Sequence, residues 1–146
     1  MSEYGDLVKA KCDAFADRVV KLNDYLLDQA ANKKPEVLKK KADGKPLFKK
    51  TVPVYLQSVS AICNQLLRSG TSIGANNAEA TNAVSKQDFR AKSYIALKEA
   101  RESLYWIELL HRNKYLDEKE YESIHDDCEE LVRILVSRCK KLDAEV

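Results

Sequence analysis

The apolar residues of this chain recur at helical spacing over most of its 146 residues. In residues 6–30 they step by four and three, which places them on one face of a helix. Those positions are Val8, Cys12, Phe15, Val19, Leu22 and Leu26. Similar stripes run through 53–83, 86–113 and 118–142, and we find no strand pattern. The sequence therefore predicts a single all-α domain, 1–146, folded as an antiparallel up-down-up-down four-helix bundle.

The predicted helix starts carry capping signals. Ser85 is followed by Asp88, and Asp117 is followed by Glu120, which is the spacing of a side chain that caps the third residue of a helix. Pro53 suits a first turn, because its missing N–H would have no partner there. These signals mark where three of the helices begin.

Composition restricts the location of the protein. No apolar run approaches 18 residues, so we expect no membrane span, and the first residues lack the apolar core of a secretory signal. A cytoplasmic location follows as an expectation. Four cysteines lack the CxxC spacing of a metal site, and we expect buried thiols rather than disulfides. They are Cys12, Cys63, Cys128 and Cys139.

Residues 32–51 form a basic connection between the first two predicted helices. We expect a loop here, with a short helix over 35–42 as an option. Its candidate phosphate contacts are Lys33, Lys34, Lys39, Lys40, Lys41, Lys45, Lys49 and Lys50. The segment has no arginine, and Phe48 is its only aromatic residue, so we expect non-specific charge contacts with RNA or DNA. The alternative is a solvated loop with no ligand.

The stretch RSGTSIGANNAEA, residues 68–80, places weak helix formers inside a predicted helix. In an antiparallel hairpin of helices, small residues on one helix would face small residues on the next. The expected neighbours are Gly70 with Ala100, Gly74 with Ala96, and Asn77 with Ser93. We therefore expect a close helix contact, in which Asn76 or Asn77 hydrogen-bonds across. The stretch lacks the lysine and the preceding strand of a phosphate-binding loop.

The predicted helix 86–113 is apolar nearly all round its axis. Tyr94 and Tyr105 share one face, and Ile95 and Trp106 share the next. One bundle core cannot cover every direction, so we expect Tyr94, Tyr105 and Trp106 to contact another subunit. The alternative is a helix that is central within its own bundle.

Two Glu-x-x-His motifs, Glu108 to His111 and Glu122 to His125, resemble the ligand pattern of di-iron bundles. Residues 53–68, which would lie at the same level, contain no acid to complete such a site. No nucleophile, base and orienting residue occur together either. We therefore predict no metal, no cofactor and no catalytic residues.

Several rare blocks occur in register with a known family. Residues 65–80, QLLRSGTSIGANNAEA, and residues 85–110, SKQDFRAKSYIALKEARESLYWIELL, resemble the bacterial bundle proteins encoded in 23S ribosomal RNA intervening sequences (S23-like proteins). The resemblance implies a small antiparallel bundle without established catalytic residues, in a family of which several members form rings, commonly pentamers. A more distant resemblance is to the accessory variability determinant of diversity-generating retroelements, a ring-forming partner of a reverse transcriptase that binds nucleic acid.

The sequence thus predicts a non-catalytic bundle that self-associates as a homo-oligomer. We expect an accessory or scaffold protein that engages nucleic acid, or an enzyme acting on nucleic acid, through its basic connection. The alternative is a scaffold for protein partners alone. The basic connection, 33–50, also departs from the shorter and less basic link usual in the family.

Overall fold

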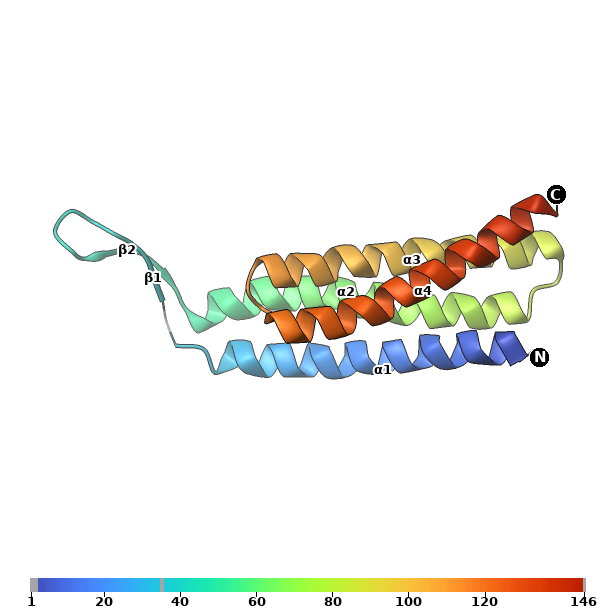
Figure 1. The fold of residues 1–146 in the computed structure, drawn as a ribbon. Helices are drawn as coiled ribbons and strands as arrows, with labels where there is room; N and C mark the ends of the chain where they lie inside the picture. Colours follow the sequence, from blue (N-terminus) through green and yellow to red (C-terminus); the bar gives the residue numbers. More distant parts are fainter. Residues whose placement is uncertain (1–2, 35, 146) are drawn as a thin grey trace.

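The computed structural model describes residues 3–34 and 36–145, without the side chains of 36–38 and 47–50. Four helices follow one another as α1 (Glu3–Ala31), α2 (Val52–Thr81), α3 (Lys86–Arg112) and α4 (Glu118–Ala144). Figure 1 shows them alternating in direction, with both chain ends at one end of the bundle. The predicted all-α, up-down-up-down bundle is confirmed. No helix within the described residues is long and apolar enough to cross a membrane.

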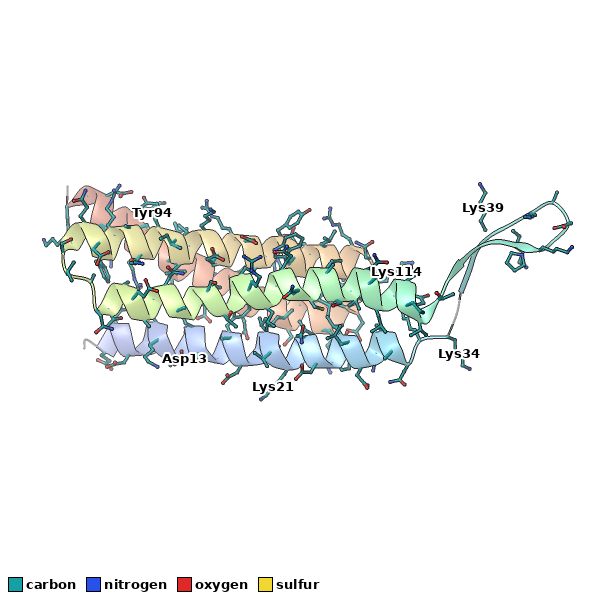
Figure 2. The ribbon with its side chains drawn as sticks, turned by 180° about the vertical axis from the view of Figure 1, so that it is seen from behind. Asp13, Lys21, Lys34, Lys39, Tyr94 and Lys114 are labelled. Carbon is teal, nitrogen blue, oxygen red and sulfur yellow. The ribbon has the colours of Figure 1, made fainter. Side chains whose placement is uncertain are left out.

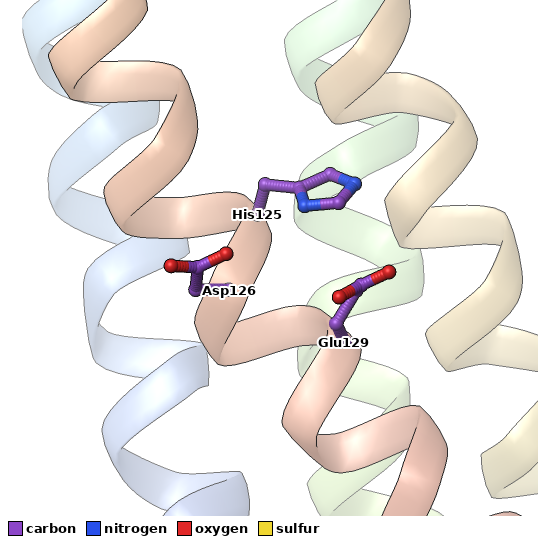
Figure 3. A group of neighbouring side chains, drawn as sticks. All are labelled: His125, Asp126 and Glu129. Carbon is purple, nitrogen blue, oxygen red and sulfur yellow. The ribbon is translucent and has the colours of Figure 1, made fainter.

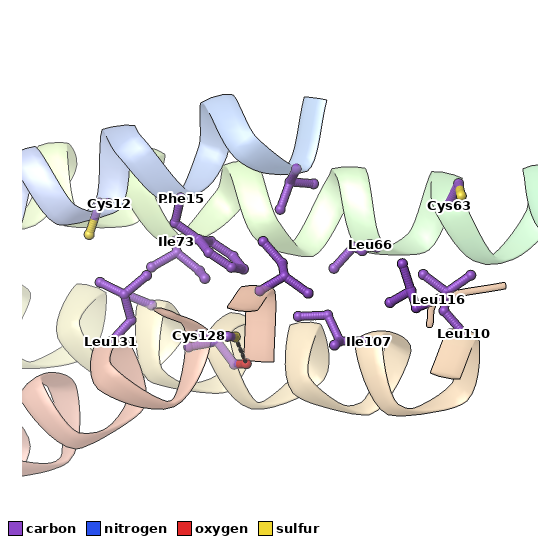
Figure 4. Packing of buried hydrophobic residues seen from close by; sticks show 14 of the residues in the cluster. Cys12, Phe15, Cys63, Leu66, Ile73, Ile107, Leu110, Leu116, Cys128 and Leu131 are labelled. Carbon is purple, nitrogen blue, oxygen red and sulfur yellow. Dashed lines mark hydrogen bonds between the residues drawn. The ribbon is translucent and has the colours of Figure 1, made fainter. Parts of the chain in front are cut away.

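The predicted apolar stripes form the core (Figure 4). Phe15 of α1, Ile73 of α2, Ile107 of α3 and Leu131 of α4 are each at most 1% exposed. Burial of such side chains supplies about 1.5–3 kcal/mol each and holds the helices together. The four cysteines are buried and free, as expected.

Both predicted caps are present. The Ser85 hydroxyl accepts a hydrogen bond from the Asp88 N–H at 3.1 Å. Asp117 accepts from the Glu120 N–H at 2.8 Å, while the Glu120 carboxylate accepts from the Asp117 N–H at 2.9 Å. These bonds satisfy N–H groups that have no partner inside the helix, and they fix where α3 and α4 begin.

The basic connection folds differently from the prediction. Strands β1 (Glu36–Lys40) and β2 (Pro46–Lys50) pair antiparallel as a β-hairpin, so the predicted loop and the short helix over 35–42 are wrong. Gly44 has φ +81°, and its N–H donates to the Lys41 carbonyl at 3.0 Å. Asp43 accepts from the Lys45 N–H at 3.0 Å. The Asp-Gly pair therefore closes a tight turn that directs the chain back as a second strand.

The glycine stretch contacts a different helix from the one predicted. A Cβ added to Gly70 would lie 3.0 Å from Cγ2 of Val19, and one added to Gly74 would lie 3.6 Å from Cβ of Cys12. Both glycines thus face α1 and not α3. The buried polar contact between α2 and α3 is a hydrogen bond from the Ser103 hydroxyl to the Ser69 hydroxyl, at 2.9 Å. Ser69 faces α3, whereas Gly70 and Gly74 lie on a neighbouring side of α2. The residues of α1 cover that side.

The two asparagines do not bridge α2 and α3 either. The Asn76 amide donates to the Ser72 carbonyl of its own helix at 2.9 Å. Asn77 accepts from Arg138 of α4 at 2.8 Å. The expected asparagine bond across the α2–α3 contact is therefore wrong, because one amide binds its own backbone and the other reaches α4.

Candidate nucleic-acid interface

The β-hairpin projects away from the bundle at the end where α3 turns into α4 (Figure 1). This is the end opposite the two chain termini. The turn between β1 and β2 lies farthest from the helices (Figure 1), so the hairpin presents its lysines away from the bundle. Figure 2 shows Lys39 on the projecting hairpin and Lys34 at its base.

The lysines of the hairpin differ in what they contact. Lys39, Lys40 and Lys41 are exposed and form no ion pair with any residue that the structure describes. Lys45 is exposed and lies 3.8 Å from the Asp43 carboxylate. The predicted contacts Lys49 and Lys50 have side chains outside the described residues; their backbone belongs to β2.

At the base of the hairpin, one lysine is held by aromatic rings. Lys33 Nζ lies 4.9 Å from the centroid of the Tyr55 ring and 5.9 Å from that of Tyr115. A cation over an aromatic face is attracted by about 0.5–2 kcal/mol. Lys33 thus joins the end of α1 to α2 and to the α3–α4 turn, and it is exposed, as is Lys34 beside it. We assign Lys33 mainly to holding the base of the hairpin.

Sequence reasoning missed a further cation at this end of the bundle. Lys114 lies between α3 and α4 with φ +61°, a conformation that favours glycine or asparagine. Its N–H donates to the His111 carbonyl at 2.9 Å, which closes the end of α3. Lys114 lies at the same end of the bundle as Lys34 (Figure 2). No feature of the sequence marks it, because glycine is the usual signal of such a turn.

The residues predicted to contact another subunit lie on α3, partly exposed. Tyr105 is 51% exposed, and its ring meets that of Trp106 edge-on at 4.9 Å between centroids. Trp106 is half-buried and donates to Glu102 at 3.2 Å. Tyr94 is 39% exposed and lies near the end of the bundle opposite the hairpin. An apolar surface is thus available on α3, and its occupant stays a prediction.

Tyr94 also makes a polar contact within the chain. Its hydroxyl donates to Asp143 at 2.5 Å, and Arg90 binds the same carboxylate at 2.7 Å. These bonds lower the pKa of Asp143, with the Tyr94 bond as the largest cause and Arg90 next. The same bond raises the pKa of Tyr94. The ring therefore contributes to joining α3 and α4, besides offering surface.

The histidines of both Glu-x-x-His motifs contact a glutamate across the α3–α4 hairpin. His111 lies 3.0 Å from Glu118, and His125 lies 3.8 Å from Glu108. The His111 ring stacks on that of Tyr121 at 4.0 Å, so these residues tie the two helices together. Figure 3 shows His125, Asp126 and Glu129 close together on one side of α4, with Glu129 four residues after His125. Their ligand atoms lie within 4.8 Å of one another, on a partly exposed surface where acidic groups commonly gather.

Comparisons with known proteins support the family resemblance. The sequence model of the 23S rRNA-intervening sequence protein family matches residues 48–137. A crystal structure of a protein of unknown function from the S23 ribosomal protein family of Bacteroides thetaiotaomicron is 36% identical. The alignment covers 94% of this chain and 98% of that one, with a TM-score of 0.70. No curated protein matches the chain.

These comparisons do not bear on the more distant resemblance to the accessory variability determinant. The family match over more than half of the chain and the shared fold show that the protein belongs to the 23S rRNA-intervening sequence protein family.

Proposed function

We propose that this protein is a non-catalytic, self-associating bundle that engages nucleic acid through its lysine-rich hairpin. One observation carries the proposal. Lys39, Lys40 and Lys41 follow one another at the projecting end of the hairpin, exposed and without an acidic partner among the described residues. Cations held apart from carboxylates are free to replace the counterions of phosphates.

The side chains available favour binding to the nucleic-acid backbone over reading of bases. Residues 32–51 contain no arginine, so the hairpin lacks the planar fork that pairs with a guanine edge. An ammonium group acts as a point charge and suits phosphate of any sequence. The expected behaviour is weak, salt-dependent binding with little sequence preference.

Self-association would raise the strength of these weak contacts. We propose that Tyr94, Tyr105 and Trp106 contact another copy of the chain, in a ring of the kind that the resemblance implies. In a cyclic assembly every hairpin would lie on the same rim, because rotation keeps the same end of each bundle together. Several hairpins on one strand would bind together with an affinity above that of any single one.

The proposal is tested by titrating the full-length protein into fluorescent single-stranded RNA and duplex DNA of equal length. The wild type should bind, and affinity should fall as salt rises. A variant carrying Lys39→Gln, Lys40→Gln and Lys41→Gln should bind at least about tenfold more weakly. No binding at about 50 mM salt, where such contacts are strong, would reject the proposal.

A protein-interaction scaffold without nucleic-acid binding is a second candidate. Ile95 is 40% exposed and Tyr105 is 51% exposed, and both lie on α3. This surface fits a protein partner as well as it fits another copy of the chain. Wild-type protein that self-associates but does not bind either nucleic acid would favour this second function.

A further inference from the structure

A cavity lies at the end of the bundle opposite the hairpin, where all four helices contribute residues. Its volume is about 600 Å³. That is within the range of about 300–1,000 Å³ that is usual for small-molecule sites. The wall combines the buried amide of Asn77, the ring of Phe89 and the cationic side chains of Arg138 and Lys141. None of these residues belongs to the hairpin or to the apolar surface of α3.

Arg138 is the central group of this cavity. It is half-buried, and one of its nitrogens donates to the Asn77 amide oxygen at 2.8 Å. The guanidinium carbon lies 5.6 Å from the centroid of the Phe89 ring. A guanidinium has five N–H donors, and no carboxylate among the described residues forms an ion pair with it. Arg138 therefore has donors available for a ligand, while Asn77 and Phe89 hold it in place.

The asparagine beside it also has unused capacity. Asn77 is 3% exposed and lines the cavity. Its oxygen accepts from Arg138, whereas its amide nitrogen has no hydrogen-bond partner among the described residues. The amide N–H groups of Asn77 are therefore available to an acceptor on a ligand in the cavity.

The charges lining the cavity favour an anion. Lys86 and Glu145 lie 3.7 Å apart and largely offset each other. Arg138 and Lys141 remain, which leaves about two positive charges. A phosphate monoester carries roughly −1.5 to −2 charges at pH 7, and an arginine fork matches its oxygens. Phe89 offers a flat apolar wall for the rest of such a molecule.

We propose that this cavity binds a small phosphate monoester with a flat aromatic body. The phosphate lies against Arg138 and Lys141, the body lies along Phe89, and Asn77 donates to an acceptor on the ligand. The site is separate from the hairpin, so its failure would leave the proposed nucleic-acid function untouched.

The test uses adenosine 5′-monophosphate as the probe, titrated into the full-length protein by calorimetry. We expect saturable binding with one site per chain. Adenosine lacks the phosphate and inorganic phosphate lacks the ring, so each should bind at least about tenfold more weakly. No saturable heat up to about 10 mM probe would overturn the proposal. Equal binding of adenosine would overturn it as well.

Variants locate the binding. Arg138→Gln should weaken binding of the monophosphate at least about tenfold, because a charge-assisted pair is lost. The matched control is Arg133→Gln on the same helix, where Arg133 is exposed and pairs with Glu129. Asn77→Asp should also weaken binding, since it places a carboxylate beside the guanidinium. Equal binding by Arg138→Gln and Arg133→Gln would contradict the proposed site.

A measurement on the wild type avoids dependence on the folding of variants. The Arg138 Nε–H resonance in nitrogen-15-labelled protein should shift as the monophosphate is added, and it should saturate with the calorimetric affinity. The Arg133 Nε–H resonance should stay in place. A saturable shift confined to resonances of other residues would show that the monophosphate binds elsewhere, and it would reject Arg138 as the binding residue.

Discussion

Gly70 of α2 lies so close to Val19 of α1 that a Cβ at position 70 would require the valine side chain to move by a few tenths of an ångström. A Cβ on Gly70 would lie 3.0 Å from one Val19 methyl and 3.2 Å from the other. Gly74, one turn further along, leaves 3.6 Å to its nearest neighbour, which is an ordinary contact. The two glycines therefore differ in how they respond to substitution.

Gly70→Ala should destabilise the bundle. The added methyl must displace a stiff β-branched side chain, which costs about 1–3 kcal/mol, partly offset by about 1 kcal/mol of helix propensity. Gly74→Ala has the propensity gain without the clash and should stabilise by up to about 1 kcal/mol. Urea unfolding measures both. A Gly70→Ala protein as stable as Gly74→Ala would contradict the close approach of α1 and α2.

A leucine at position 74 is a harsher change. The Cβ of the leucine fits, but the atoms nearest to it include the Cys12 backbone carbonyl oxygen at 3.9 Å. The rest of the leucine side chain therefore requires α1 to move. Gly74→Leu should lower the melting temperature by several degrees or reduce the native mass. An unchanged melting temperature and native mass would show that α1 yields without cost.

Lys114→Gly should have two separable effects. Glycine relieves the strain of φ +61° and should stabilise the protein by up to about 1 kcal/mol. The same change removes a cation from the hairpin end of the bundle and should reduce the salt dependence of nucleic-acid binding by about one phosphate contact. Thermal unfolding and salt titration measure the effects independently. Lys114→Asn tolerates the same conformation and serves as the control for backbone relief.

The buried cysteines should resist modification while the protein is folded. Burial raises the pKa of Cys128 to about 12, and of Cys12 and Cys63 to about 11. The reactive species is the thiolate, so roughly one thiol in a thousand or fewer is reactive at pH 8 at these positions. A disulfide reagent should react slowly in buffer and rapidly in urea. Fast reaction of all four cysteines in the folded protein would contradict their burial.

The raised pKa values of these thiols make the stability of the fold depend on pH in the alkaline range. A thiol with a raised folded pKa contributes stability that is full below its unfolded pKa, about 8.5. That contribution is lost as pH rises toward about 11–12, where the folded thiols ionise. Cys128→Ala should make the loss of stability between pH 9 and 11 less steep than in the wild type.

Substitution on α3 tests self-association. Tyr105→Glu places a charge on a residue that is 51% exposed, so the fold should survive while contact with another subunit is weakened. The native mass, measured by light scattering, should fall toward that of one chain. Val20→Glu is the control, because Val20 is 43% exposed on α1, outside the proposed contact. Equal masses for both variants and the wild type would reject Tyr105 as a contact.

The helical part of the fold could be predicted because its signals are local. The stripe through Phe15 gave the buried face of α1, and the caps at Ser85 and Asp117 gave the starts of two helices. The hairpin was also marked locally, by Asp43 and Gly44 between two short apolar pairs. High lysine content around this signal favoured a loop, which is why the prediction there was wrong.

Other features depend on which elements meet in space. Helical period shows that Gly70 shares a face with other residues, but not that α1 rather than α3 covers it. Lys33 is held by Tyr55 and Tyr115, which lie on separate parts of the chain. The cavity around Arg138 forms only because four helix ends converge there. Such contacts follow from packing, and no short sequence pattern carries them.

The most direct test of the proposed function compares two variants with the same loss of charge. One carries Lys39→Gln, Lys40→Gln and Lys41→Gln on the hairpin. The other carries Lys21→Gln, Lys98→Gln and Lys140→Gln, all exposed on the helices. Affinity for duplex DNA is measured across salt concentrations. For the hairpin variant, the slope of log affinity against log salt should be less steep than that of the wild type by up to about 2.7, which corresponds to three lost phosphate contacts. The helix variant should keep the wild-type slope. Equal slopes for the two variants would show that only overall charge matters and would contradict the hairpin as the interface.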